Sequence, residues 1–197
     1  MGEKSSRQVK SSVLPENDLL NDAVIFAVER HCGQLRKGTG IPYIVHPIET
    51  MSILVNMRAD VSLMAAGILH DVIEDTDTSE TELLERFGED VYNLVMSHTE
   101  DKSKSWEERK KHAVSETVNA PFRSKMLVLA DKVANLRSLR SDYRELGDAL
   151  WNRFNAPKEK QAWYYGEMKK ALSETEGDFR TAEIYGEMVK LCEELFG

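Results

Sequence analysis

Apolar positions recur along most of the chain at the three- and four-residue spacing of amphipathic helices. In the first helix that we predict, from Asn17 to about Gln34, one face carries Leu20, Val24, Ala27 and His31. Gly and Pro then interrupt the spacing over residues 35–46, which predicts a loop. The sequence shows no sustained period-two alternation, so we expect no sheet. The pattern therefore predicts an all-α fold.

Capping residues set the boundaries of the later helices. Pro47 suits the first turn of a helix, and Asp60 suits an N-cap. Ser79 and Glu82 have the spacing of a capping box, and Gly88 is a natural helix end. We expect helices at 47–56, 61–74, 79–88, 89–99, 105–118, 122–141, 145–154, 157–174 and 178–195.

Length and composition describe one globular domain. The 197 residues suffice for a single core, and 41% hydrophobic with 30% charged residues is ordinary for a globular protein. We expect residues 1–16 to be a disordered polar arm and residues 17–197 to form the domain. No secretory signal is visible, and two cysteines make no disulfide framework, so a cytoplasmic location is expected.

The charge balance restricts the partners. With 34 acidic against 26 basic residues, the chain carries a formal charge of -8, which disfavours nucleic acid as a partner. Apolar runs are far shorter than the ~20 residues of a membrane-spanning helix, so we expect no membrane partner. A small phosphorylated ligand needs only a local group of Lys and Arg, and a homo-oligomer stays possible.

A cluster of titratable residues falls at the end of the predicted helix 61–74. On a helix, His70 lies beside Glu74 and Asp71 beside Asp75, because residues four apart share a face. One imidazole and three carboxylates in an otherwise apolar stretch repel and desolvate one another unless a cation neutralises them. An ordinary acidic helix end is the alternative for the His-Asp dipeptide alone.

Two further residues favour a metal site over that alternative. His46 stands in PYIVHP at a helix start, and Asp131 follows an apolar run that reads as a core helix. A carboxylate there is costly unless it is paired or binds a metal. With His70 and Asp71, these residues supply two nitrogen and two oxygen donors. That set suits a divalent transition ion such as manganese or iron, with zinc or cobalt possible.

Five short motifs extend the argument from chemistry to a family. The stretches HCGQLRKG, PYIVHP, ILHDVIEDTDT, FGEDV and LADKVANLRS occur in order over about residues 20–140. Together they resemble the hydrolase domain of the RelA/SpoT stringent-response enzymes. They are also similar to the stand-alone small alarmone hydrolases, including the metazoan SpoT homologue. After Arg140 the likeness fades, so residues 141–197 form divergent C-terminal helices.

The resemblance implies an HD-domain helical bundle around a single manganese ion. It implies hydrolysis of the 3′-pyrophosphate of ppGpp or pppGpp, which gives GDP or GTP and pyrophosphate. By position, Glu74 and Asp75 match the acidic pair beside the attacking water. The positions that match the metal ligands are His46, His70, Asp71 and Asp131.

The resemblance also assigns the substrate contacts. Arg36 and Lys37 match a pair that lies against the nucleotide, and Lys102 matches a phosphate-facing lysine of the short hydrolases. Asn135 and Ser138 fall where the family contacts the guanosine. Because the leaving pyrophosphate is highly charged, we expect cationic side chains to face it.

Other charged residues are weaker candidates for the site. Lys104, Arg109 and Arg137 are secondary candidates for phosphate contacts, although we interpret the run 109–111 as a solvated helix face. His98 has no partner by spacing, and we expect it to be an ordinary helix or surface residue.

The divergent third leaves the substrate open. We interpret Trp151, Tyr164 and Tyr165 as core packing, although a ring that stacks on a base would change which nucleotide fits. The alternatives are therefore an HD phosphohydrolase for another 3′-pyrophosphorylated nucleotide or for NADPH, and a catalytically silent nucleotide sensor. No synthetase domain follows, so we expect hydrolysis only.

Overall fold

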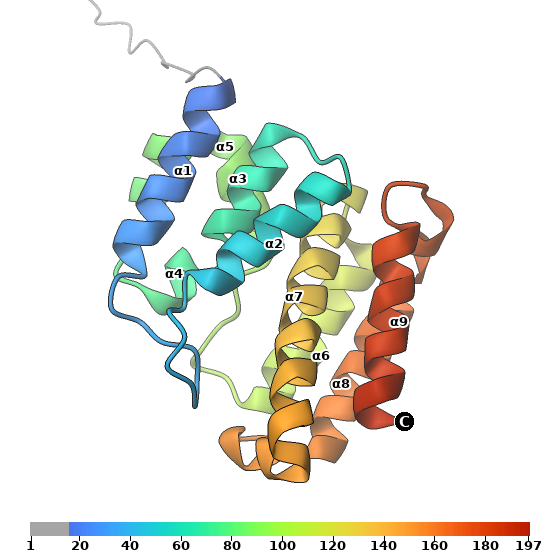
Figure 1. The fold of residues 1–197 in the computed structure, drawn as a ribbon. Helices are drawn as coiled ribbons and strands as arrows, with labels where there is room; N and C mark the ends of the chain where they lie inside the picture. The colour runs from blue at the N-terminus through green and yellow to red at the C-terminus, as the bar shows by residue number, and fades with distance from the viewer. Residues whose placement is uncertain (1–15) are drawn as a thin grey trace, which may run out of the picture.

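A computed structural model describes residues 16–197, and these residues are helical without any strand (Figure 1). This confirms the all-α prediction; the sole strand-like feature in this range is an isolated antiparallel bridge between Leu35 and Pro42. The helices are α1 (Glu16–Arg30), α2 (Val45–Asn56), α3 (Val61–Leu69), α4 (Val72–Asp75), α5 (Glu80–Met96), α6 (Trp106–Asn119), α7 (Phe122–Leu146), α8 (Lys158–Ala171) and α9 (Ala182–Phe196), with the 3₁₀ segments η1 (Gly147–Arg153) and η2 (Ser173–Gly177).

The first half of the chain packs around α3, which is almost entirely buried. Helices α1, α2 and α5 each lie against it (Figure 1). Phe26 of α1 meets Phe87 of α5 edge to face, with ring centroids 5.3 Å apart. Immediately after Phe87 the chain turns at Gly88, whose φ of 80° separates two helical stretches within α5. The predicted helix end at Gly88 is therefore confirmed.

The long helix α7 joins the two halves of the molecule. It packs on α2 and α3 along one side and on α9 along another, and α6 and α8 pack against each other beside it (Figure 1). The C-terminal aromatic rings form part of this packing: Tyr165 stacks on Phe196 at 5.6 Å, and Trp151 lies 5.5 Å from the same ring. The central part of α7, which includes Asp131, is consequently buried on several sides.

The structure departs from the predicted boundaries where polar groups compete with the helix. The helix predicted over 61–74 is wrong as a single element, because the chain leaves α3 after Leu69 and resumes as the short α4. His70 and Asp71 lie in the break between them. The residues predicted as helix 145–154 form the tighter 3₁₀ segment η1 instead. The expected N-terminal arm lies outside the described residues apart from Glu16, where α1 begins.

Among the described helices, none combines the length and the apolar character that crossing a bilayer requires.

Candidate metal centre

Three segments distant in sequence bring the predicted donors together. His46 lies in the first turn of α2, His70 and Asp71 lie in the break after α3, and Asp131 lies in the middle of α7. The approach of α2 to α3 depends on Gly67, because a Cβ there would lie 2.4 Å from a Leu54 methyl. The absence of that side chain lets the two histidines meet at the end of both helices.

The ring nitrogens and carboxylate oxygens face one another at short distances. The Nε2 atoms of His46 and His70 are 3.2 Å apart. Asp71 Oδ2 lies 3.0 Å from His70 Nε2 and 3.5 Å from His46 Nε2. Asp131 Oδ1 lies 3.2 Å from His46 Nε2 and 3.7 Å from His70 Nε2. One atom each from His46, His70 and Asp131 lies within 4.8 Å of the other two, and Asp71 Oδ2 lies beside both histidine rings.

These separations fit the coordination shell of one divalent ion. Ligand atoms about 2.1 Å from a shared ion lie roughly 3.0–3.4 Å from their neighbours in tetrahedral or octahedral arrangements. Three of the five separations fall in this range, and those of 3.5 and 3.7 Å are slightly longer. His70 Nδ1 donates to Gly67 O at 2.8 Å, so the Nε2 lone pair is available to a metal. His46 Nδ1 is buried and lacks a hydrogen-bond partner among residues 16–197. The donor set thus fits a metal, as the sequence suggested.

The charges of the four groups also fit a bound cation. Burial alone would lower the pKa of His70, but the Asp71 and Asp131 carboxylates raise it well above its ordinary value. Despite burial, the pKa of Asp71 is lowered by His70, and the pKa of Asp131 is lowered by Lys132 and the histidines. The carboxylates are therefore ionised, and a divalent cation would take the place of the second proton on the His70 ring.

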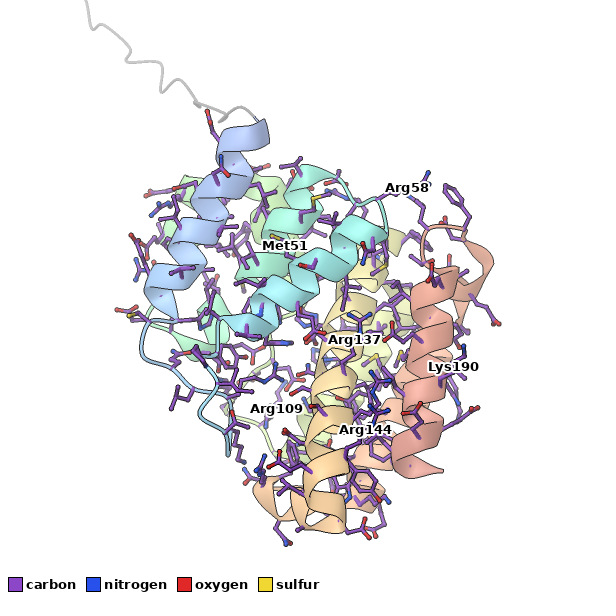
Figure 2. The ribbon with its side chains drawn as sticks, in the orientation of Figure 1. Met51, Arg58, Arg109, Arg137, Arg144 and Lys190 are labelled. Atoms are coloured by element: carbon purple, nitrogen blue, oxygen red, sulfur yellow. The ribbon has the colours of Figure 1, made fainter. Side chains whose placement is uncertain are left out.

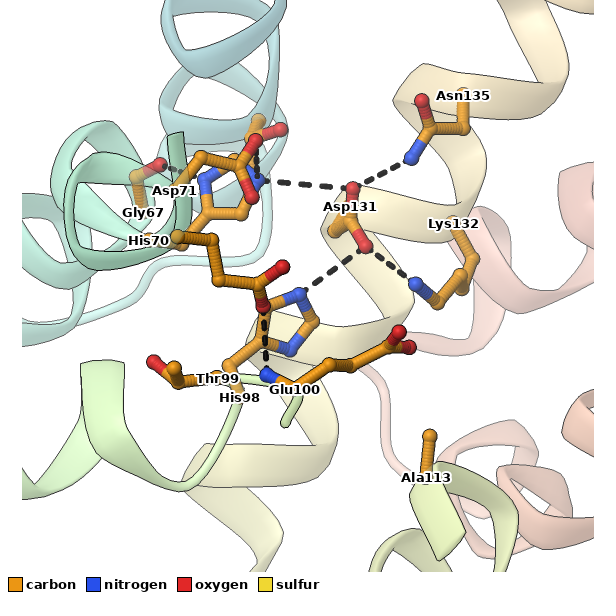
Figure 3. A network of polar contacts seen from close by, with 12 residues as sticks. Gly67, His70, Asp71, His98, Thr99, Glu100, Ala113, Asp131, Lys132 and Asn135 are labelled. Atoms are coloured by element: carbon orange, nitrogen blue, oxygen red, sulfur yellow. Dashed lines mark hydrogen bonds and ion pairs between the residues drawn. The ribbon is translucent and has the colours of Figure 1, made fainter. Parts of the chain in front are cut away.

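Asp131 is held by an array of donors that sequence reasoning only partly found (Figure 3). Asn135 Nδ2 donates to Oδ1 at 2.6 Å, while Lys132 Nζ donates to Oδ2 at 2.5 Å. His98 Nε2 also lies 3.1 Å from Oδ2. Oδ2 is thus occupied by protein donors, and Oδ1 faces the two histidines.

The expectation that His98 is an ordinary helix or surface residue is wrong. Its side chain is 10% exposed, and its ring lies 5.4 Å from that of His70. Burial lowers the pKa of His98, so its ring is neutral and donates one N–H to Asp131. His98 reaches Asp131 across 33 positions of sequence, and no local pattern in the sequence signals that contact.

Tyr43 is a second contact of the donor set that the sequence did not single out. Its hydroxyl donates to Asp71 Oδ2 at 2.6 Å, and its ring lies 5.9 Å from that of His46. Burial and the Asp71 carboxylate raise the pKa of Tyr43, which keeps the hydroxyl protonated as a donor. The sequence feature that could have indicated this contact is the position of Tyr43 three residues before His46 in PYIVHP.

The two predicted catalytic carboxylates have different surroundings. Burial, with smaller contributions from Asp71 and Glu100, raises the pKa of Glu74 to about 7. Glu74 Oε1 accepts the backbone N–H of Glu100 at 2.7 Å. Asp75 Oδ1 instead accepts from Lys102 Nζ at 2.5 Å. Glu74 is thus the better placed of the two to exchange a proton near neutral pH.

A cavity of about 420 Å³ opens beside the donors. His46, Asp71 and Asp131 line one part of it together with Glu74 and Asp75. The segment between α5 and α6, the inner face of α6 and residues of α7 and α8 line the rest. A cavity of this volume is in the range of small-molecule sites.

The structure brings most of the predicted substrate residues to this region. Lys102 and Asn135 line the cavity, and Arg36 Nη2 lies 3.4 Å from Asn135 Oδ1. Ser138 lies one turn after Asn135 on α7 and is half-buried. Lys37 is exposed, and its Nζ lies 3.4 Å from Asn155 Oδ1. Their roles in binding stay predictions.

The secondary candidates separate into two groups. Arg109 and Lys110 line the cavity and pair with Glu100 at 3.0 and 2.8 Å, so their interpretation as a solvated face is wrong. Arg137 lies elsewhere, between α2 and α9, where it pairs with Glu187 and Glu49 (Figure 2).

Three aromatic residues of the C-terminal third are buried, whereas Trp163 is 39% exposed. Trp151, Tyr164 and Tyr165 are at most 8% exposed. Tyr164 lines the cavity, and its ring lies 5.0 Å from Lys110 Nζ and 5.7 Å from Lys132 Nζ. The rings thus pack the C-terminal helices, and Tyr164 also forms one wall of the cavity.

The fold and the donor set agree with a comparison against known families. The HD domain model matches residues 23–159, which is more than half of the chain. The chain belongs to the HD domain family. The His-Asp dipeptide at His70 and Asp71 lies within the matched range.

Curated relatives of this HD domain protein include nucleotide hydrolases and synthetases. Guanosine-3′,5′-bis(diphosphate) 3′-pyrophosphohydrolase MESH1 of Danio rerio is 40% identical over 124 residues, 61% of this chain and 69% of the relative. The human MESH1 is 40% identical over 123 residues with the same shares. GTP pyrophosphokinase of Myxococcus xanthus is 37% identical over 134 residues, which cover 64% of this chain and 18% of that enzyme.

Solved structures share the fold of this HD domain. The structure of a metazoan ortholog of SpoT that hydrolyzes ppGpp superimposes with a TM-score of 0.74 at 26% identity. That match covers 93% of this chain and 98% of the other. The crystal structure of a Listeria monocytogenes EGD-e protein gives a TM-score of 0.69 at 32% identity, over 77% of this chain and 98% of the other.

Proposed function

We propose that this HD domain protein hydrolyses the 3′-pyrophosphate of guanosine alarmones, converting ppGpp or pppGpp to GDP or GTP and pyrophosphate. The observation that carries the proposal is the convergence of His46, His70, Asp71 and Asp131 on one point at the edge of a cavity with cationic walls. The similarity to MESH1 hydrolases from several animals supports the choice of substrate.

The proposed cofactor is a divalent metal, with manganese as our specific proposal. His46 and His70 would bind it through Nε2, and Asp71 and Asp131 through single carboxylate oxygens. A divalent ion there polarises a phosphoryl oxygen and lowers the pKa of a water that it binds.

The chain's own residues would then carry the proton and hold the substrate. Hydrolysis to GDP and pyrophosphate breaks the bond between the sugar 3′-oxygen and its phosphorus, and the water oxygen bonds to that phosphorus. The bond pair stays on the 3′-oxygen, which takes up a proton and becomes the 3′-hydroxyl of GDP. Glu74, whose pKa lies at about 7, accepts the water proton. Asp75 holds Lys102 at the cavity wall, where the ammonium faces the phosphates. Arg36, Lys37, Asn135 and Ser138 are the proposed nucleoside contacts.

The proposal extends to the domain organisation, the compartment and the partners of the protein. We propose that residues 17–197 act as one domain and that the enzyme is cytoplasmic. Its partner is a small nucleotide and neither nucleic acid nor a membrane, and self-association stays open.

The test is an anion-exchange assay of ppGpp incubated with purified protein and Mn²⁺, beside an EDTA control and Asp71→Ala. We expect metal-dependent formation of GDP and pyrophosphate that is abolished in the variant. A parallel panel contains NADPH, which would be cleaved at its 2′-phosphate, and other 3′-pyrophosphorylated nucleotides. If another nucleotide of the panel is cleaved while ppGpp is not, the choice of substrate is overturned. If the protein binds the metal but cleaves none of the nucleotides, it is a silent sensor.

A further inference from the structure

A buried anion of the protein itself occupies the cationic wall of the cavity. Glu100 lies in the segment between α5 and α6, and its carboxylate bridges Arg109 Nη1 at 3.0 Å and Lys110 Nζ at 2.8 Å. The Glu100 side chain is 15% exposed, and the two cations are 23% and 19% exposed. Burial would raise the pKa of Glu100, but Lys110, Lys132 and Arg109 lower it, so the carboxylate is ionised.

This carboxylate differs from the other acidic groups of the cavity. Each of the remaining basic side chains there has its own partner: Lys102 pairs with Asp75, Lys132 with Asp131, and Lys104 with the exposed Asp101. Asp75 and Asp131 already have roles in the proposed reaction. Glu100 alone pairs with two buried cations without having such a role, so it is the group that a stronger anion can replace.

The cation pair is built to hold an anion. Arg109 Nε is buried without a hydrogen-bond partner among the described residues, so an unused donor remains. Lys110 Nζ and Lys132 Nζ both lie over the ring of the buried Tyr164, at 5.0 and 5.7 Å, and this contact limits their movement. Charge-assisted hydrogen bonds from such fixed donors strengthen with the charge of the acceptor.

The position of the pair relative to the metal donors indicates which anion it takes. Lys132 Nζ bonds Asp131 Oδ2, and the backbone N–H of Glu100 bonds Glu74 (Figure 3). The cations Lys132, Lys110 and Arg109 thus line the cavity beside the metal donors, joined through the Tyr164 ring and through Glu100, whose backbone N–H meets the proposed base. A diphosphate with one phosphate at the metal would extend its second phosphate along these cations.

We infer that Arg109 and Lys110 form the subsite for the diphosphate that leaves in the reaction, and that Glu100 occupies this subsite in the free protein until the diphosphate displaces it. The identity of the ligand rests on the proposed function. A diphosphate carries more charge and more acceptor oxygens than one carboxylate, so it can satisfy Arg109 Nε as well as the two groups that Glu100 binds.

The test is a calorimetric titration of the Mn²⁺-loaded protein with inorganic pyrophosphate at fixed excess Mn²⁺. Arg109→Gln and Lys110→Gln should each weaken binding about tenfold, the usual cost of a charge-assisted hydrogen bond. Glu100→Gln should tighten binding several-fold, a direction that a damaged fold would not produce. Lys111→Gln, next along the same helix but exposed, is the matched control and should bind as the wild type does.

The outcomes separate this inference from the proposed function. Equal affinities for Lys110→Gln and Lys111→Gln, or weaker binding in Glu100→Gln, would overturn the subsite. A loss of affinity in Lys110→Gln for GDP, with its 5′-diphosphate, but not for pyrophosphate would also overturn it. Alarmone hydrolysis is measured separately with the wild-type protein. If the protein does not hydrolyse ppGpp but the variants show the expected affinities for pyrophosphate, the proposed function is contradicted and the subsite stands.

Discussion

At the scale of single residues, the donors around Asp131 explain how one carboxylate can act as a metal ligand. His98 and Lys132 occupy Oδ2, so Oδ1 is the oxygen left to face His46 and His70. Burial of such a group without partners would cost several kcal/mol. The residues that hydrogen-bond a metal ligand therefore influence the affinity for the metal almost as strongly as the ligands themselves do.

His98 provides the sharpest test of that arrangement. We expect His98→Ala to weaken Mn²⁺ binding at least about tenfold, because outer contacts of this kind typically change metal affinity by 10–100-fold. His98→Gln, which can still donate an N–H, should recover part of the loss. Calorimetric Mn²⁺ titration measures both, with Lys111→Ala, which is exposed on α6 and does not line the cavity, as the control. Unchanged affinity in His98→Ala would contradict the role.

The environment of Glu74 predicts how the rate depends on pH. A base must be unprotonated, so kcat/KM should fall about tenfold per pH unit below the pKa of Glu74. That pKa is about 7 without a metal against an ordinary 4.5, and a bound cation lowers it, so the decline should begin between these values. Initial rates from pH 4.5 to 8.5 measure the profile. A rate that stays constant across this range, or a decline that persists unchanged in Glu74→Gln, would exclude Glu74 as the base.

Patterns in the sequence predicted which residues carry the chemistry better than they predicted which residues contact one another. His46, His70, Asp71 and Asp131 were identifiable because each stands in a motif or in an apolar run that makes its burial costly. Glu100 and Lys110 were not identifiable and Arg109 was only a secondary candidate, because a charged run on a helix is usually solvated. Only the packing of α6 and α8 beside α7 encloses them.

At the scale of elements, close helix packing positions the metal donors. Helices α2 and α3 meet at Gly67, whose carbonyl also fixes the ring of His70. The helix break at His70 and Asp71 was not predicted, because the apolar spacing continues through it. In contrast, the turn at Gly88 was predicted, because its positive φ is a conformation that glycine adopts readily.

Substitution of Gly67 tests the close approach. Gly67→Ala places a methyl 2.4 Å from the fully buried Leu54, so we expect a loss of about 1–3 kcal/mol in the free energy of unfolding. Gly166→Ala in α8, where a Cβ would have open space, should instead stabilise by about 0.5–1 kcal/mol. Urea unfolding of both variants gives the comparison, and equal stabilities would show that Gly67 is not needed for packing.

At the scale of the whole molecule, the metal site connects its two halves. Its donors come from α2, from the break after α3 and from α7, so a bound ion would tie the N-terminal helices to the C-terminal bundle. The sequence predicted this all-α architecture because the helical spacing is strong throughout. It did not distinguish the 3₁₀ segment η1, or the start of η2, from the α-helices predicted over 145–154 and 157–174, because one or two 3₁₀ turns have nearly the same residue spacing as α-helical turns.

Metal binding should therefore stabilise the molecule in a pH-dependent way. At 100 times Kd, a metal that binds only the folded state adds about 2.7 kcal/mol, which raises Tm. The raised pKa of His70 means that binding must release a proton, so the gain should shrink as pH falls. Thermal unfolding with Mn²⁺ and with EDTA at several pH values measures it. A Tm that does not respond to Mn²⁺ would contradict a metal link between the halves.

The central claim is that one ion at His46, His70, Asp71 and Asp131 makes the chain an alarmone hydrolase. The most direct measurement is the rate of ppGpp hydrolysis as metal-free protein is titrated with Mn²⁺. We predict that the rate rises in proportion to added metal and levels off at about one equivalent per chain, as one site of this kind requires. Hydrolysis that is independent of added metal, or none at full occupancy, would contradict the account.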